Sequence, residues 1–169
     1  MNKAQIKSVL SFQKKIVNSI PSYPALHKAW VDKYGKQIIA DHFKVIRFKE
    51  QVDGIAQHGD NCPEGWIEKH DAVEGILADA FENSNENMLI VTEAELKEHI
   101  KNPDAPRTKD TGRTFWNFGD QLPWVDANYL LDILKIVPDA KFYKPKHVHI
   151  PIYFDGTNGD GILCPIRQN

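Results

Sequence analysis

Cysteine is scarce in this chain, and long apolar runs are missing. Only Cys62 and Cys164 occur among 169 residues, too few for the disulfide framework of a small secreted domain. The first residues contain no continuous apolar stretch of the kind found in signal peptides and membrane spans. We therefore expect a cytoplasmic protein in a reducing setting, without a membrane partner.

The chain also lacks an excess of positive charge. Its 21 Lys and Arg residues face 23 Asp and Glu residues, which gives a formal net charge of −2. No global basic field therefore indicates nucleic-acid binding, and any such contact requires a local patch. Repeats of solenoid period and low-complexity tracts are absent as well. The length and the 41% hydrophobic content predict a single domain with its own core.

The motifs of several enzyme classes are missing. The sequence contains no P-loop, no dinucleotide-binding glycine pattern, no paired CxxC zinc pattern and no HExxH metal helix. His58-Gly59-Asp60 and Asp41-His42 each place a carboxylate near an imidazole, which would suit general-base chemistry if the side chains met. No serine or cysteine motif accompanies them. We expect no enzyme activity, no cofactor and no metal.

The most informative stretch is the closing one, 115–167. An aromatic-rich strand at 115–118 ends at Gly119-Asp120. Asp126 is the predicted N-cap of a helix in which apolar residues recur at helical spacing as far as Val137. Strands are predicted at 140–143, 147–154 and 161–166, with a glycine-rich turn at 155–160 between the last two.

The beginning of the chain predicts a similar unit. Apolar residues lie along one broad face of a predicted helix at 2–18, and strands are expected at 25–31, 37–40 and 44–48. At about 100° per residue, Lys3, Lys7 and Lys14 share one narrow strip of that helix. Such a strip is either an ordinary solvated face or a surface directed at phosphates.

The central segment, 54–112, is rich in acidic residues. It predicts a short helix at 71–81, a polar loop at 83–87 and a buried strand at 88–91. Thr92 and Glu95 form a predicted capping box that opens a helix ending at Ile100. A second polar loop is expected at 102–112.

Several of these stretches resemble the bacterial DNA polymerase III sliding clamp family. The sequences VDANYLLDIL at 125–134, PI at 151–152 and GILCPIR at 161–167 are similar to the last half-domain of a clamp, and KQIIADHFKVIR at 36–47 is similar to an earlier clamp segment. Cys164 stands where the family usually has methionine, and Asp126 where it commonly has asparagine. Ala40 replaces a threonine and His42 replaces a glycine, so either His42 is strained or the turn differs.

The resemblance implies an α+β fold, a DNA clamp-like domain built from two helix-plus-antiparallel-strands half-domains. These would occupy about 1–53 and 113–169, with a helical insertion at about 54–112. In clamps the helices meet duplex DNA through its phosphates, which implies that Lys3, Lys7, Lys14 and Lys135 face DNA. The family also holds polymerases and other replication proteins in a groove beside the last strand, where Pro165, Ile166 and Arg167 match its motif.

A single clamp-like domain would need about six copies to form a ring, so the resemblance implies a homo-oligomer, of phage or mobile-element origin. Two alternatives stay open. The first is an inhibitor or immunity-type module that lacks DNA binding and uses its acidic central segment against a basic protein. The second is a small metal-dependent hydrolase, because His147 and His149 would share one face of the strand predicted at 147–154.

Overall fold

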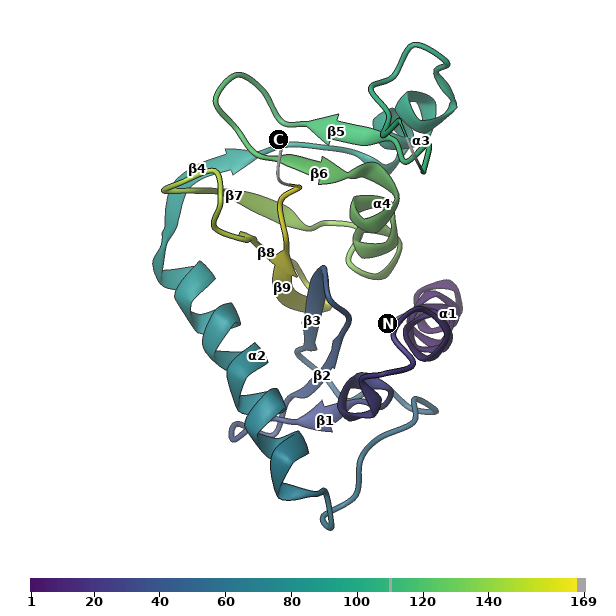
Figure 1. The fold of residues 1–169 in the computed structure, drawn as a ribbon, viewed down its shortest axis with the longest axis vertical. Coiled ribbons are helices and arrows are strands. Elements are labelled where there is room, and N and C mark those ends of the chain that lie inside the picture. The colour runs from purple at the N-terminus through teal and green to yellow at the C-terminus, as the bar shows by residue number, and fades with distance from the viewer. Residues whose placement is uncertain (110, 167–169) are drawn as a thin grey trace.

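The computed structural model describes residues 1–109 and 111–166, which form a mixed α+β structure (Figure 1). The helices are α1 (Lys3–Ser19), η1 (Pro24–Leu26, a 3-10 helix), α2 (Glu64–Glu82), α3 (Glu93–Lys101) and α4 (Ala127–Ile136). The strands are β1 (Trp30–Val31), β2 (Gln37–Ala40), β3 (Lys44–Phe48), β4 (Ser84–Leu89), β5 (Phe115–Asn117), β6 (Trp124–Asp126), β7 (Lys141–Pro145), β8 (Ile152–Asp155) and β9 (Gly159–Leu163).

The main sheet is antiparallel and has the strand order β1-β2-β3-β9-β8-β7-β4, while β5 and β6 form a separate hairpin. Strand β3 pairs with β9 from Lys44↔Leu163 to Phe48↔Gly159. This pairing joins the strands of the first part of the chain to those of the last. A Cβ on Gly161 would lie only 2.0 Å from the carbonyl oxygen of Val45, so the junction requires glycine at this position.

Helices cover both faces of the main sheet (Figure 1). Helices α1 and α4 pack side by side on one face, where Lys44 of β3 reaches the ring of Phe12 in α1. Helix α2 covers the other face, where Phe81 contacts the ring of Tyr153 in β8. The sheet is therefore the middle layer. The largest fully buried side chains of the core, from the sheet and from α1 and α4, include Phe12, Phe48, Phe142, Phe154, Ile38, Ile39, Ile46, Leu130 and Ile133.

Local capping chemistry starts three of the helices, and the sequence predicted the caps of two of them, α3 and α4. Asn2 and Gln5 form a capping box at the start of α1, and Thr92 and Glu95 form the predicted one at the start of α3. The side chain of Asp126 accepts hydrogen bonds from the first backbone N–H groups of α4, which confirms it as the N-cap. The strands predicted at 37–40 and 44–48 are confirmed as β2 and β3.

Several strand predictions were wrong in extent. Residues 25–31 contain η1 and only the two-residue strand β1, because Pro24 favours the first turn of a helix. The strand predicted at 161–166 is shifted to Gly159–Leu163, and the one predicted at 147–154 begins only at Ile152. His42 has no positive φ, since Gln121 is the single non-glycine residue with one in the described chain. The turn therefore differs from one that requires glycine.

The central segment is more than a helical insertion. Helix α2 is longer than the predicted 71–81, and of the residues predicted as a loop at 83–87, Asn83 ends α2 while 84–87 belong to strand β4. Strand β4 pairs with β7 and ends the main sheet on one side, so the segment contributes both an edge strand and the cover of one sheet face. None of the helices in the described residues is both long and apolar enough to cross a membrane.

Candidate functional site

Helix α1 carries an exposed basic face. Its 17 residues include four lysines and no acidic residue. Val9, Phe12 and Ile16 are buried against the sheet, whereas Lys3, Lys7 and Lys14 are exposed on the other side of the helix. On α4, Lys135 is exposed as well.

Among residues 1–109 and 111–166, none of these four predicted lysines forms an ion pair. Their ammonium groups therefore have no carboxylate that a phosphate would have to displace. Two exposed apolar residues, Leu10 and Val17, border the strip formed by Lys3, Lys7 and Lys14.

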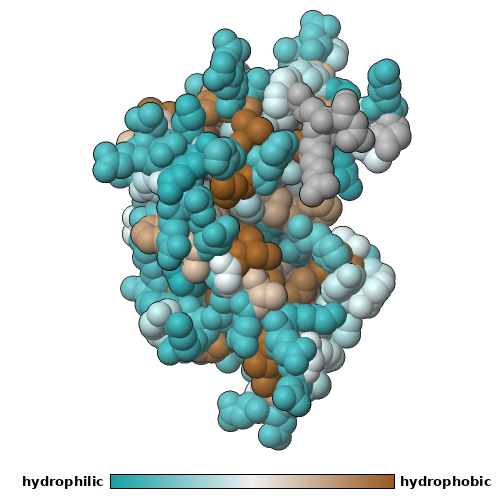
Figure 2. All heavy atoms as spheres, turned by 60° about the vertical axis from the view of Figure 1, so that its left-hand side comes forward, coloured by the Kyte–Doolittle hydropathy of each residue, from teal (hydrophilic) through white to brown (hydrophobic). Residues whose placement is uncertain are grey.

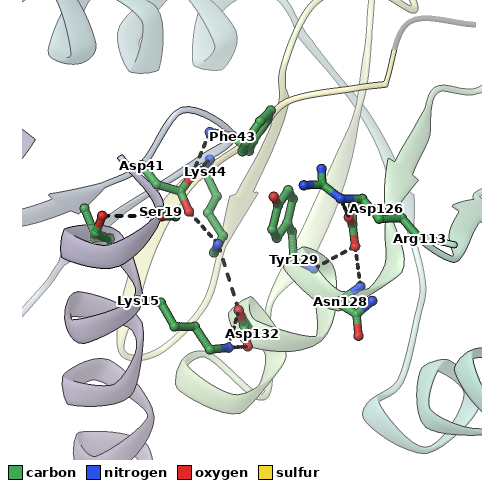
Figure 3. Close-up of polar contacts among 11 residues, drawn as sticks. Lys15, Ser19, Asp41, Phe43, Lys44, Arg113, Asp126, Asn128, Tyr129 and Asp132 are labelled. Atoms are coloured by element: carbon green, nitrogen blue, oxygen red, sulfur yellow. Dashed lines mark hydrogen bonds and ion pairs between the residues drawn. The ribbon is translucent and has the colours of Figure 1, made fainter. Parts of the chain in front are cut away.

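A buried cation fastens the two helices to the sheet below this face. The Nζ atom of Lys44 lies 2.7 Å from Oδ2 of Asp41 and 3.9 Å from Oδ2 of Asp132 (Figure 3). The ring centroids of Phe12 and Tyr129 each lie 4.3 Å from the same atom. The Lys44 side chain is only 2% exposed. Two carboxylates and two ring faces thus take the place of water around its charge.

Asp132 also connects the two helices directly. Lys15 of α1 places its Nζ atom 3.1 Å from Oδ1 of Asp132 in α4 (Figure 3). The Lys15 side chain is 59% exposed, so this pair is solvated and contributes little stability by itself. Its position shows that the polar contact between α1 and α4 continues from the buried Lys44 to the surface.

Tyr129 lies above Lys44 at the start of α4. Its ring stacks on Phe43 with a centroid distance of 5.0 Å, and the guanidinium carbon of Arg113 lies 5.8 Å from its centroid (Figure 3). Burial is the main cause that raises the pKa of the Tyr129 hydroxyl. Phe43 is 41% exposed. An aromatic pair with a cation beside it therefore reaches the surface next to α4.

The C-terminal segment runs past the same pair, but it is not a strand. The Cys164 N–H donates to the carbonyl oxygen of Phe43 at 2.7 Å, and the Ile166 N–H donates to that of Trp124 at 2.7 Å. Pro165 and Ile166 are half-buried, while Arg167 lies outside the described residues. Burial raises the pKa of the Cys164 thiol to about 11, which keeps it protonated at neutral pH. A partner-peptide groove at these positions stays a prediction.

The structure contradicts the geometry that suggested a metal site. His147 and His149 lie in an exposed turn before β8, where the Ile150 N–H donates to the carbonyl oxygen of His147. The alternation of a strand therefore does not place the two imidazoles on one face. In the described part of the chain, no group of three or more His, Cys, Asp or Glu side chains is arranged to hold a metal ion.

The sequence neighbours proposed as acid-base pairs have other partners. Asp41 is hydrogen-bonded to the backbone N–H groups of Phe43 and Lys44 and to the Lys44 ammonium. The Nε2 atoms of His58 and His70 lie 3.0 and 2.7 Å from the carbonyl oxygen of Ala25. A carbonyl only accepts hydrogen bonds, so both Nε2 atoms carry the proton.

His58 and His70 also line a cavity of about 320 Å³ together with Cys62 and Trp30, which stacks on His70 with centroids 4.4 Å apart. Burial is the first cause that lowers the pKa of His58, and the neighbouring His70 lowers it further. The carbonyl oxygen of Ala25 raises it in part. The cluster is therefore polar, aromatic and already hydrogen-bonded internally.

The α2 side of the molecule is acidic and partly apolar. Helix α2 contains six acidic residues and one lysine, and Ile67, Ile76 and Phe81 on it are 46%, 48% and 61% exposed. Figure 2 turns this side forward and shows apolar patches within a largely hydrophilic surface. Two cavities of about 420 and 490 Å³ adjoin each other here, since Tyr34 and Arg47 line both.

A second charged cluster lies on this face of the sheet. Arg47 binds Asp160 through two hydrogen bonds, from Nε at 3.0 Å and from Nη2 at 2.6 Å. The Tyr153 hydroxyl donates to Oδ2 of Asp160 at 3.2 Å, and burial of this tyrosine raises its pKa. Asp32 lies 3.7 Å from Nη1 of Arg47.

Comparison with known proteins found no matching family model, no matching curated protein and no matching solved structure. The function of the chain is therefore inferred from its own residues. Sequence reasoning missed Lys44 as a buried cation, although a lysine directly before the apolar Val45 and Ile46 in a predicted strand was a usable signal. It also missed the cluster of Phe43 and Tyr129, whose 86-residue separation no local pattern reveals.

Proposed function

We propose that this protein is a non-enzymatic, clamp-like protein that binds duplex DNA through its phosphates, without reading the base sequence. The observation that supports this proposal is the face of α1 with Lys3, Lys7 and Lys14, which is exposed and free of acidic residues. Lysines act on phosphates as point charges, and their contacts carry no sequence information. The resemblance to sliding clamps points to the same helix.

The contacts beneath this face hold α1 in place, which also supports the proposal. The buried residues Val9, Phe12 and Ile16 hold α1 against the sheet, and Lys44 and Asp132 tie α4 to the sheet beside it. The lysines of α1 are therefore presented from a fixed helix rather than from a loop. A preorganised row of charges loses less conformational entropy when it meets a regular phosphate backbone.

The test is binding of a fluorescein-labelled 30-base-pair duplex, measured by fluorescence anisotropy at several salt concentrations. The triple substitution Lys3→Ala, Lys7→Ala and Lys14→Ala removes the proposed contacts and preserves helix propensity. We expect roughly tenfold weaker binding or more at low salt. The slope of log affinity against log salt should become shallower by about 3, because three counterion-releasing contacts are lost.

The matched control replaces Lys28, Lys101 and Lys141 with alanine. These residues are exposed and lie outside α1, so the control makes the same change in net charge at other places. We expect it to bind duplex almost as the unmodified protein does. Equal weakening by both variants would show that only total charge matters, and it would contradict the assignment to α1.

We also propose that the protein self-associates. Strands β1 and β4 are the two ends of the main sheet in the described residues, and edge strands offer unpaired backbone groups. Met88 in β4 and Ile90 directly after it are 48% and 83% exposed. We expect light scattering to give an oligomer whose mass falls when both residues are changed to lysine. A monomer at all concentrations would overturn this part of the proposal.

A second candidate function is binding of a basic protein through α2. The observation that favours it is the combination of acidic side chains with exposed Ile67, Ile76 and Phe81 on one helix. Acidic charge would steer a basic partner and the apolar residues would hold it. If the protein is an oligomer that does not bind duplex DNA in the anisotropy experiment, this candidate function would be favoured over DNA binding.

A further inference from the structure

A row of aromatic rings crosses the surface beside the α1 and α4 layer. Tyr23, which follows α1, meets His42 with centroids 4.6 Å apart in an edge-on contact. His42 lies 6.3 Å from Phe43 in the turn between β2 and β3, and Phe43 stacks on Tyr129 of α4 at 5.0 Å. The row is thus built from three segments that are distant in the sequence.

The outer rings of this row are accessible and the inner ring is a support. Tyr23 and Phe43 are each 41% exposed, and His42 is exposed too. Tyr129 has Phe43 stacked on its ring and the Lys44 ammonium 4.3 Å from its centroid. Phe43 and Tyr23 therefore offer ring surface to a ligand, whereas Tyr129 holds Phe43 in place.

The turn that carries the central rings is held by hydrogen bonds. Oδ1 of Asp41 accepts from the N–H groups of Phe43 at 2.7 Å and Lys44 at 2.8 Å. The Phe43 carbonyl oxygen accepts from Cys164 at 2.7 Å. A ring fixed by its backbone in this way needs little ordering when a flat ligand stacks on it.

Cations stand at both ends of the row. The Nζ atom of Lys69 lies 4.9 Å from the ring centroid of Tyr23, and the guanidinium carbon of Arg113 lies 5.8 Å from that of Tyr129. The Arg113 side chain is 48% exposed, and its Nε atom lies 4.0 Å from Oδ2 of the buried Asp126. Aromatic surface between two cations matches a chain of flat bases joined by phosphates, because bases stack on rings and phosphates attract cations.

We propose that this row binds an unpaired stretch of nucleic acid, with bases stacked on Phe43 and Tyr23 and with Lys69 and Arg113 near the phosphates. The inference deepens the proposed function, because both assign nucleic-acid binding, but it uses different residues from the lysines of α1. Stacking of this kind tolerates any base sequence. The protein would then contact both paired and unpaired strands, as at the end of a duplex.

The test uses the full chain and a fluorescein-labelled 20-nucleotide oligothymidylate in an anisotropy titration. The double substitution Tyr23→Ala and Phe43→Ala should weaken binding at least about tenfold, because alanine substitution removes stacking for two bases. It should leave affinity for the 30-base-pair duplex unchanged. The conservative pair Tyr23→Phe and Phe43→Tyr keeps both rings and should bind as the unmodified protein does.

Two controls make the test specific. Tyr34 and Phe81 are exposed aromatic residues outside the row, 70% and 61% exposed, and their double alanine variant should retain single-strand binding. An abasic oligonucleotide of the same length keeps the phosphates and should bind at least about tenfold more weakly than oligothymidylate, because stacking is lost. Thermal unfolding of each variant checks that it is folded.

The outcomes separate this inference from the proposed function. The double alanine variant of Tyr23 and Phe43 could bind duplex and also bind the single strand as tightly as the unmodified protein. That result would overturn the single-strand site proposed at the row and leave the α1 proposal intact. Equal affinity for the abasic strand also overturns it, since charge alone would then explain binding. Preference for a synthetic peptide over both nucleic acids, lost in the same variant, would show a peptide site and overturn it as well.

Discussion

The helices on the two faces of the main sheet carry opposite charges. Each face also has its own ion cluster beneath the helices, centred on Lys44 on one side and on Arg47 on the other. On one face, α1 has four lysines and no acidic residue; on the other, α2 has six acidic residues and one lysine. Below them, strand β3 directs Lys44 toward α1 and α4 and Arg47 toward the α2 side. The net charge of −2 conceals this separation. Local charge on a helix, not the total, indicates the partner.

The two clusters differ in their access to water. The Lys44 side chain is 2% exposed and that of Arg47 is 31% exposed. A fully buried cation depends wholly on its protein partners. Water can take the place of some partners of a partly exposed cation. The comparison therefore predicts that the α1 side is the more sensitive to loss of its cation.

The largest effect is expected for Lys44→Met, which keeps much of the side-chain volume and removes the charge. Asp41 would remain partly buried without a cation and Asp132 would keep only the exposed Lys15, so the free energy of unfolding should fall by about 3–5 kcal/mol. Urea unfolding followed by circular dichroism measures it. The control Lys15→Ala removes an exposed partner of Asp132 and should change stability by less than about 1 kcal/mol. A stable Lys44→Met protein would contradict the role given to this cluster.

A smaller loss is expected for Arg47→Met on the other face. Asp160 would lose two hydrogen bonds but would keep the Tyr153 hydroxyl and gain water through the adjoining cavities. We expect a decrease of about 2 kcal/mol in the free energy of unfolding. The same urea experiment tests the ranking. An effect larger than that of Lys44→Met would reverse the comparison of the two faces.

The His58 cluster should add a pH dependence to stability. The pKa of His58 in the folded protein lies below its ordinary value of 6.5, first because of burial and then because of His70, Lys28 and His27 nearby. The unfolded chain therefore binds more protons just below pH 6.5, and stability decreases as the pH falls through that region.

Because solvent screens this part-exposed group, we expect the His58 contribution to be below about 1 kcal/mol. Urea unfolding at pH 7.5 and pH 5.5 measures it, and the variant His58→Gln should show a smaller difference between the two pH values. An unchanged difference in the variant would assign the pH dependence to other groups.

The smallest effect is expected when charge is removed from the acidic side. Glu68→Gln, Asp71→Asn and Asp79→Asn together neutralise exposed residues of α2, which lies across the sheet from α1. Salt screens charges over about 8–10 Å, so duplex affinity at physiological salt should increase less than about twofold in the anisotropy experiment. A large increase would mean that DNA passes close to α2, and it would end the separation of the two faces.

The sequence predicted elements whose signals lie within a few residues. The capping box of Thr92 and Glu95, the N-cap Asp126 and strands β2 and β3 were all predictable. The caps depend on hydrogen bonds between residues close in the chain, and β2 and β3 are short, largely apolar runs, although both are buried on both faces rather than alternating. The α+β class that the resemblance implied agrees with the observed helices and antiparallel sheet, whereas a clamp-like arrangement stays a proposal.

The extent of the remaining strands depended on pairing partners. Residues 83–87 are polar and were predicted as a loop, yet residues 84–87 form part of β4 because β7 is available beside them. The prediction for His147 and His149 was wrong for the opposite reason: their segment pairs with no strand and turns instead. Strand formation reflects neighbours as much as intrinsic preference.

The amino-acid sequence by itself determined the lysine strip of α1 and the acidic character of α2, because helical periodicity places residues on a face without reference to the rest of the fold. Only the tertiary structure decided that Lys44 meets Asp132, that Tyr23, Phe43 and Tyr129 form one row, and that the two charged helices lie on opposite sides of a sheet. Those contacts join distant segments, and they exist only after β3 has paired with β9 and the helices have packed.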